Sequence, residues 1–149
     1  MTVAMRDYEK LAESGWRESL RGMIFPSHCD HMGHVNNRWD GHFFDDASMA
    51  FWSAVGLSEA GLQSQFGTSA VIAHNSFDYW HELLNGQQFV VMSAFTRVGT
   101  KALAMKHVCF KTTQVSCASS TPVSRCFSTS SCAIQVRCLN LCERLWKHS

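Results

Sequence analysis

The sequence predicts a single domain of the α+β class, in which one long helix packs on one face of an antiparallel sheet. Three observations support this prediction. One segment has apolar residues at helical spacing, the segments after it alternate like strands, and the length of 149 residues suits one hydrophobic core. Apolar residues make up 46% of the chain and charged residues 17%, which is typical of a globular protein and unlike a disordered one.

The first half of the chain should contain the helix. Residues 5–15 are expected to form a short helix, and residues 16–25 a strand that ends at Pro26. The main helix is predicted between Trp39 and Val55, with a stop at Gly56. Its apolar side chains recur at helical spacing: Phe43, Phe44, Ala47, Phe51, Ala54 and Val55. Met49 and Trp52 lie off this stripe, so we expect other structure to surround the helix.

Three strands are predicted after the main helix. They cover residues 69–80, 88–98 and 101–111, where apolar and β-branched residues are frequent or alternate with polar ones. Asn85-Gly86 is a strong turn signal, and Gly99-Thr100 fits a tight hairpin between the second and third of these strands. Those two strands should therefore be antiparallel neighbours.

The C-terminal part, residues 112–149, forms an atypical tail rich in Ser, Thr and Cys. Only Cys132–Leu141 resembles a strand, so the tail lacks the pattern expected of a final strand. If it cannot complete the sheet, an unpaired edge would remain. The chain has seven cysteines, and their spacings contain no Cys-x-x-Cys pair of the kind that binds zinc. We favour free thiols, with one or two disulfides left open.

The charge pattern argues against several classes of partner. With 13 basic and 12 acidic residues, the formal net charge is +1, so there is no broad basic field for nucleic acid. The chain has no apolar run long enough for a membrane-spanning helix, and we expect no membrane association. Charges interrupt the apolar stretches near the N-terminus, which is unlike a signal peptide, so we expect a cytoplasmic protein.

The loop before the main helix carries most of the polar chemistry. It reads Phe25-Pro-Ser-His-Cys-Asp-His-Met-Gly-His-Val-Asn-Asn37. On residue types alone, Asp30 could be a catalytic carboxylate or could cap a turn. Its neighbours His31 and His34 also leave open a site for a divalent metal. Their spacing in an irregular loop does not guarantee a common face, and we expect no metal.

Recognition of a family comes from two adjacent runs, HCDHMGHVNNRW and HFFDDASMAFWSAVGL. They resemble the 4-hydroxybenzoyl-CoA thioesterase family, whose signature is an Asp, a Gly three residues later, and then the hotdog helix. The similarity continues weakly to about residue 108. It implies that residues 1–149 form a single hotdog domain, with a long central helix wrapped by a curved antiparallel sheet. It also implies an acyl-CoA substrate, no cofactor, and a homodimer or homotetramer with active sites at the subunit interface.

The resemblance assigns roles to particular residues. Asp30 would attack the thioester carbonyl or activate water, the Asn37 amide would polarise the carbonyl oxygen, and His34 would lie beside the site. A catalytically silent hotdog that binds an acyl-CoA or a protein stays open as an alternative. One departure is Trp39-Asp40, where many relatives have a tyrosine-containing pair, and it puts the pocket shape in doubt. The residues expected to contact substrate are Gly33, Asn36, Arg97 and Lys101.

Overall fold

The computed structural model describes residues 12–99, 102–112 and 123–136. Its elements, in chain order, are β1 (Arg17–Met23), a 3-10 helix (Pro26–His28), α2 (Asn37–Ala54), α3 (Glu59–Phe66), β2 (Ala70–Tyr79), β3 (Gln88–Val98), β4 (Ala102–Thr112) and β5 (Val123–Val136).

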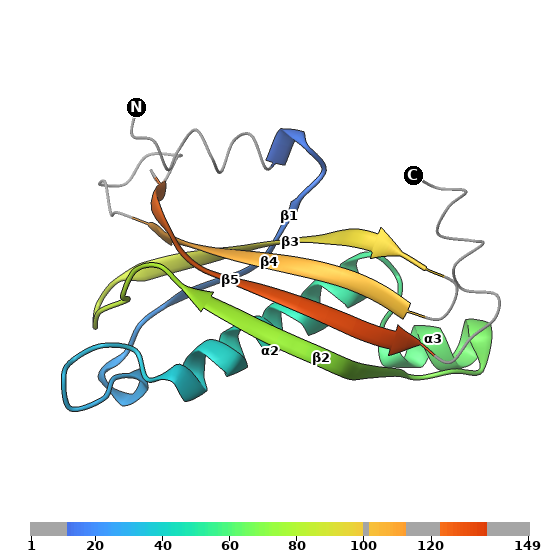
Figure 1. Cartoon of the computed structure of the whole chain (residues 1–149), viewed down its shortest axis with the longest axis horizontal. Coiled ribbons are helices and arrows are strands. Elements are labelled where there is room, and N and C mark those ends of the chain that lie inside the picture. The colour runs from blue at the N-terminus through green and yellow to red at the C-terminus, as the bar shows by residue number, and fades with distance from the viewer. Residues whose placement is uncertain (1–11, 100–101, 113–122, 137–149) are drawn as a thin grey trace.

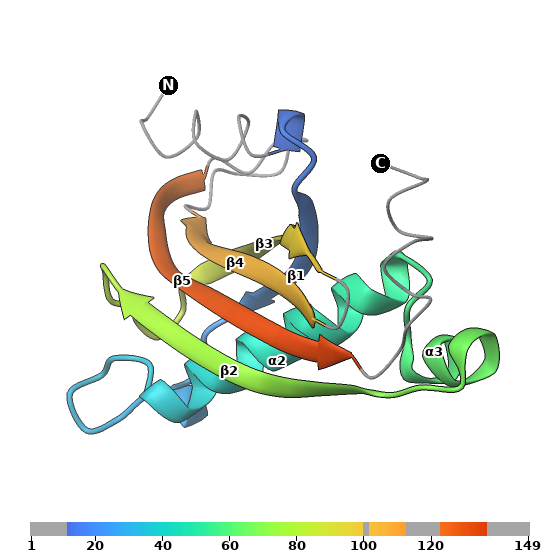
Figure 2. The ribbon, with the colours of Figure 1, turned by 45° about the vertical axis from the view of Figure 1, so that its right-hand side comes forward.

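The strands form one antiparallel sheet in the order β1-β3-β4-β5-β2. The sheet is curved, and α2 lies along one of its faces (Figures 1 and 2). This arrangement confirms the predicted α+β hotdog fold, with a long helix against an antiparallel sheet. The β3–β4 hairpin is antiparallel as predicted, and the turn at Asn85-Gly86 is also present, with Gly86 at a φ of 78°.

The hydrophobic core lies between α2 and the sheet. The helix buries Phe44, Ala47 and Phe51, which are spaced three and four residues apart and therefore share one face. The Phe44 ring lies 5.8 Å from the Phe77 ring of β2, and the Phe51 ring lies 5.1 Å from the Phe95 ring of β3. These contacts hold the helix across the sheet. The opposite flank of the helix is open, since Met49 is 65% exposed.

Three local expectations need revision. The helix α2 begins at Asn37, two residues before Trp39, because Asn36 caps it: the Asn36 Oδ1 accepts a hydrogen bond from the Arg38 amide. The short helix α3, with a serine cap at its start and a left-handed glycine at its end, had not been predicted. The expected helix at 5–15 falls largely outside the described residues. The expectation that other structure surrounds α2 is wrong for its Met49 flank.

The largest difference concerns the tail. The strand expected at Cys132–Leu141 is instead β5, Val123–Val136, and it lies between β4 and β2 inside the sheet. The family resemblance ends near residue 108 in the sequence, which leaves open whether the tail completes the sheet; the structure shows that its described part does so through β5. The β5 segment is rich in Ser and Cys and shows no clear apolar alternation, so its own sequence does not indicate a strand. Its pairing with β4 and β2 depends on parts of the chain that are distant in sequence.

No helix in the described part of the chain is long and apolar enough to cross a lipid bilayer.

Candidate active site

The loop between the 3-10 helix and α2 folds back on itself around Asp30. The Gly33 amide donates to the Asp30 carbonyl oxygen at 3.1 Å, and the Asp30 amide donates to the His34 carbonyl oxygen at 2.8 Å. Gly33 has a φ of 84°, a backbone conformation that favours glycine. The loop closes through a β-bridge between Cys29 and Val35. Asp30 is therefore held by its own backbone next to the start of the helix.

The Asp30 carboxylate is bound by backbone amides through a single oxygen. Its Oδ1 accepts hydrogen bonds from the Met32 amide at 2.8 Å and from the His34 amide at 3.3 Å. The Met32 bond is the main cause that lowers the pKa of Asp30. The His34 amide and the nearby His31 and His34 side chains lower it further, and partial burial opposes them. Asp30 is thus a carboxylate at neutral pH.

The first turn of α2 faces the same region. Asn37 is the first residue of the helix, so its amide has no intrahelical carbonyl to which it can donate. The positive end of the helix dipole lies at this terminus and stabilises negative charge placed there. The Asn36 side chain caps the helix, and its contact with substrate stays a prediction.

A cavity of about 350 Å³ brings this chemistry together. The loop and the first turn of α2 form one wall, and the segment at and after the end of β2 forms the other. The lining residues are Asp30, His34, Val35, Asn37, Asp40, Tyr79, Trp80, His81, Glu82 and Leu83. The cavity therefore contains the three residues assigned to catalysis: Asp30, Asn37 and His34.

His34 links the two walls of this cavity. Its Nε2 lies 3.1 Å from the Glu82 Oε2, and its backbone forms a bridge with Leu84. The Val35 amide donates to the Leu83 carbonyl oxygen at 2.9 Å. The segment from Tyr79 to Leu84 is far from the loop in sequence, so its role as the second wall had not been predicted. The only sequence signal was the weak family similarity of this stretch.

Asp40 was noted in the sequence only as a departure from the family. In the structure it is 3% exposed and lines the cavity. Burial raises the pKa of Asp40 to about 7. Its position three residues after Asn37 places both side chains on neighbouring parts of one helical face. This spacing was the signal that could have identified Asp40 as a site residue.

Of the two cations expected to contact substrate, Arg97 lies away from this cavity. Arg97 is near the end of β3, where it pairs with Ala104 of β4. Across the sheet, Ala104 is aligned through β5 with His74 of β2. The cavity residue Tyr79 is five residues beyond His74, which is roughly 17 Å along the strand. Within one chain, Arg97 is therefore remote from Asp30. Lys101 lies outside the described residues. Contacts of both with substrate stay predictions.

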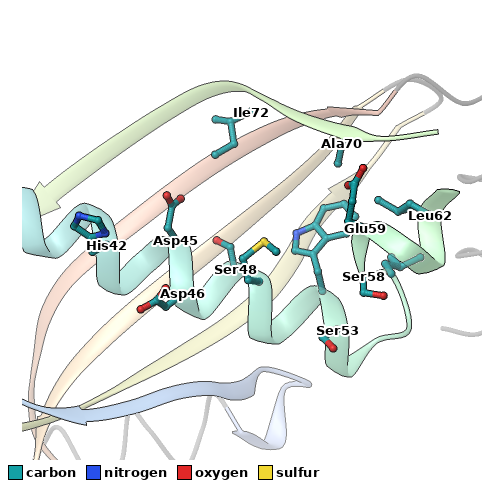
Figure 3. Close-up of a pocket in the computed structure, with 13 residues that line it drawn as sticks. His42, Asp45, Asp46, Ser48, Ser53, Ser58, Glu59, Leu62, Ala70 and Ile72 are labelled. Carbon is teal, nitrogen blue, oxygen red and sulfur yellow. The ribbon is translucent and has the colours of Figure 1, made fainter.

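A second, larger cavity of about 550 Å³ lies between α2, α3 and β2 (Figure 3). Asp45 and Ser48 of α2, Leu62 of α3 and Ile72 of β2 contribute to its lining. Asp45 points toward the β2 side in Figure 3. The cavity is open toward solvent along the exposed strand β2, where Ile72 is 54% exposed. None of the residues assigned to catalysis lines it.

A buried polar chain lies behind this second cavity. The Ser48 Oγ is 3.0 Å from the His107 Nε2, and the His107 Nδ1 is 2.6 Å from the Ser93 Oγ. Ser93 in turn lies 2.6 Å from the Ser19 Oγ. Both imidazole nitrogens therefore have partners, which satisfies a ring that is 1% exposed. Burial lowers the pKa of His107 to about 4, so the ring is neutral.

The His-rich loop is the part of the sequence that could supply metal ligands. In the described part of the chain, no three His, Cys, Asp or Glu side chains gather closely enough to hold an ion. The His31 and His34 pair of the sequence is therefore not joined by a third ligand among these residues.

Solved structures with the same fold include several thioesterases. A probable thioesterase from Bartonella henselae superposes with a TM-score of 0.67 at 12% identity, covering 83% of this chain and 92% of that one. A 1,4-dihydroxy-2-naphthoyl-CoA thioesterase from Synechocystis has a TM-score of 0.63 at 14% identity, covering 80% and 81%. A hypothetical protein from Staphylococcus aureus, solved in complex with CoA, has a TM-score of 0.67 at 16% identity, covering 85% and 74%.

The sequence comparisons agree with the fold. No curated protein sequence matches the chain. A family description matches residues 25–136, a range that includes the Asp30 loop, the whole of α2 and all of β5. The resemblance read from the Asp30 motif is thereby confirmed and extends further along the chain than residue 108. The chain belongs to the thioesterase-like superfamily.

Proposed function

We propose that this protein hydrolyses an acyl-CoA thioester to a carboxylic acid and free CoA. The observation that carries the proposal is the cavity at the start of α2, where the Asp30 carboxylate and the Asn37 residue at the helix N-terminus line the same space. A thioester carbonyl placed there would meet a nucleophile or base on one side and an oxyanion donor on the other.

The chemistry requires an ionised Asp30, and the loop provides it. Both backbone bonds go to Oδ1, so Oδ2 is the oxygen available to attack the carbonyl carbon or to take a proton from water. Attack gives a tetrahedral intermediate whose oxygen is stabilised by the helix amide and dipole. Its collapse breaks the C–S bond. The departing thiol has a pKa of about 8.5 if it resembles a simple thiol, so it leaves more readily than an alkoxide.

The comparisons support CoA as the group on sulfur. One Staphylococcus aureus protein of this fold was solved in complex with CoA, and the Synechocystis neighbour is a CoA thioesterase. Their identity to this chain is low, so the proposal does not depend on their acyl groups. The preference for a particular acyl group is set by side chains that converge from several elements. The first experiment must therefore determine which acyl group is accepted.

The test is a panel of acyl-CoAs with aromatic, short aliphatic and betaine-like acyl groups. Thiol release is followed with a disulfide reporter, corrected for the seven cysteines of the protein. We expect turnover of at least one member, unchanged by a chelator. Saturable binding without release of thiol would contradict the proposal and favour a silent acyl-CoA-binding module. Loss of turnover with chelator would favour a metal-dependent hydrolase.

We further propose that two chains associate through β2. This strand is at the edge of the sheet, and its residues Val71 and Ile72 are 63% and 54% exposed. The other edge strand, β1, carries the charged residues Arg17, Glu18 and Arg21. An exposed apolar edge strand favours pairing with another chain, whereas charges discourage it. A two-fold symmetric contact along β2 is therefore the arrangement that we expect in a homodimer or in a homotetramer built from such dimers.

Ile72→Asp should shift the protein toward monomers, because the contact would bury an unpaired charge. Light scattering at micromolar concentration should give at least twice the 16.7 kDa of one chain for the unmodified protein and the single mass for the variant. Met23→Asp, on the other edge strand, is the matched control and should keep the larger mass. If the unmodified protein is monomeric and still hydrolyses acyl-CoA, the active site is not shared between subunits.

A further inference from the structure

We propose that Asp40 is a second catalytic carboxyl group, which donates a proton to the departing sulfur while Asp30 acts on the carbonyl carbon or on water. This inference rests on the proposed thioester hydrolysis and names a residue that the Asp30 motif does not include. It assigns a function to the position where this chain departs from the tyrosine-containing pair of many relatives.

The environments of the two carboxyl groups differ in the way that acid–base pairs require. Asp30 is partly exposed and accepts backbone hydrogen bonds, which lower its pKa. Asp40 is 3% exposed, and burial raises its pKa to about 7. Near pH 6, Asp30 is therefore ionised and Asp40 carries a proton. Two carboxyl groups whose pKa values are pushed apart in one site are suited to opposite roles.

The geometry of the helix places Asp40 within reach of the reacting group. Asn37 and Asp40 are three residues apart on α2, so their Cβ atoms are about 5–6 Å apart, and both side chains line the cavity with Asp30. A thioester whose carbonyl oxygen meets the Asn37 amide has its sulfur one bond from the carbonyl carbon. The Asp40 carboxyl group lies about one helical turn from Asn37, so it can reach that sulfur.

The proton balance of this step is complete. Asp30, or a water deprotonated by Asp30, forms a bond to the carbonyl carbon, and the C–S bond then breaks. The Asp40 proton passes to sulfur, so CoA leaves as a thiol and Asp40 becomes a carboxylate. Water hydrolyses the anhydride if Asp30 was the nucleophile, and if Asp30 was the base it releases to solvent the proton that it took from water. Asp40 regains a proton from solvent, and the net reaction consumes one thioester and one water.

A purely structural role explains Asp40 less well. An acidic residue in the first turn of a helix stabilises it through the dipole when it is charged. Asp40 is largely protonated below its pKa of about 7, so it contributes little to such an interaction in mildly acidic solution. A buried polar group that faces a cavity and lowers stability is more often retained for function.

Several groups face Asp40 and bear on its titration. From the loop these are Asp30 and His34, and from the opposite wall they are Tyr79, His81 and Glu82. The Asp40 charge is a secondary cause of the raised pKa of Tyr79, after burial, which places these two groups near each other. Glu82 is paired with His34. Burial is the cause of the raised pKa of Asp40.

The test compares Asp40→Asn with the unmodified protein across pH 5 to 9, on the acyl-CoA that the panel identifies. In the unmodified protein, kcat should fall as the pH rises through about 7, because Asp40 loses its proton. The variant should be about ten- to one-hundred-fold slower below pH 7 and should lose this decline. Asp40→Glu should restore the decline in part. A variant with unchanged kcat, or with the same decline, would overturn the inference.

The leaving group supplies a second readout that is independent of how much variant folds. The same acyl group is presented on CoA and on thiophenol, a more acidic thiol, and the ratio of the two rates is measured for each preparation. We expect Asp40→Asn to be much less impaired on the thiophenyl ester. An equal loss on both esters would count against proton donation. Asp46→Asn, which removes a carboxylate from the exposed side of the same helix, should match the unmodified protein in both measurements.

The two proposals fail in different ways. If no acyl-CoA is hydrolysed by the unmodified protein, the proposed function is wrong. If hydrolysis occurs and depends on Asp30 but Asp40→Asn keeps its pH profile and its leaving-group ratio, only the role of Asp40 is wrong.

Discussion

Asp30→Asn is expected to lower kcat for acyl-CoA hydrolysis by about a hundred- to ten-thousand-fold, the usual range for loss of a general base, and by more if Asp30 is a nucleophile. The substitution is suited to the geometry of the loop. An amide oxygen can still accept the hydrogen bonds that the Met32 and His34 amides donate to Oδ1. The loop should therefore keep its shape, while the second oxygen is replaced by an amide nitrogen that can neither attack carbon nor accept a proton.

His34→Ala is the informative comparison for Asp30→Asn. The bond from His34 to Asp30 comes from the backbone amide, so this variant keeps that bond and removes the imidazole, with its contact to Glu82 and its electrostatic effect on the pKa of Asp30. We expect it to cost less activity than Asp30→Asn. Rates are measured by thiol release, with circular dichroism to verify folding. Near-normal turnover by folded Asp30→Asn would refute the assignment, and equal losses together with chelator sensitivity would indicate a metal site.

Ser131→Pro is expected to destabilise the protein severely, by about 3 kcal/mol. Ser131 lies in β5 and pairs with Lys106 of β4 and with Ser76 of β2. Proline has no amide hydrogen and is rarely tolerated in a central strand. An unsatisfied buried carbonyl on a neighbouring strand costs about 1–3 kcal/mol, and the proline ring adds a steric cost. This is a large part of the typical stability of a small domain, about 5–15 kcal/mol.

Urea denaturation of Ser131→Pro and of its control Ser131→Ala tests the position of β5. Alanine keeps the backbone amide, so the control should change the free energy of unfolding far less than proline does. If β5 contributed nothing to the stability of the fold, both variants would unfold at the same urea concentration as the unmodified protein.

The sequence predicts the elements that depend on local patterns. The apolar spacing of α2 is visible because every third or fourth side chain faces the sheet, and the β3–β4 hairpin is visible because of its glycine turn. The strand β5 is not predicted in full, because its place depends on two neighbours that are distant in the sequence. The same applies to the second wall of the cavity, where Tyr79 to Leu83 meet the Asp30 loop.

The candidate site also has a part that the sequence predicts and a part that it does not. Asp30, His34 and Asn37 can be proposed from the sequence because they lie in one short motif, and they line one cavity. Arg97 was chosen for its charge alone, and the strand register places it far along the sheet. The burial of Asp40 is a property of the folded chain, which explains why the motif alone gave no role for it.

The buried imidazole of His107 has a consequence for the acid stability of the fold. Its pKa falls from an ordinary 6.5 to about 4, so between these values the unfolded chain binds a proton that the folded chain does not, and the free energy of unfolding decreases as the pH falls. Asp40 has the opposite effect, because its pKa rises from 3.8 to about 7. In that window the folded chain keeps a proton that the unfolded chain releases, and stability decreases as the pH rises. Each slope reaches about 1.4 kcal/mol per pH unit, and between pH 4 and 6.5 the two nearly cancel. The protein thus contains two buried ionisable groups, Asp40 on α2 and His107 on β4, whose proton linkages compensate each other, so that a protonated acid in the cavity adds little net pH dependence to folding in this range.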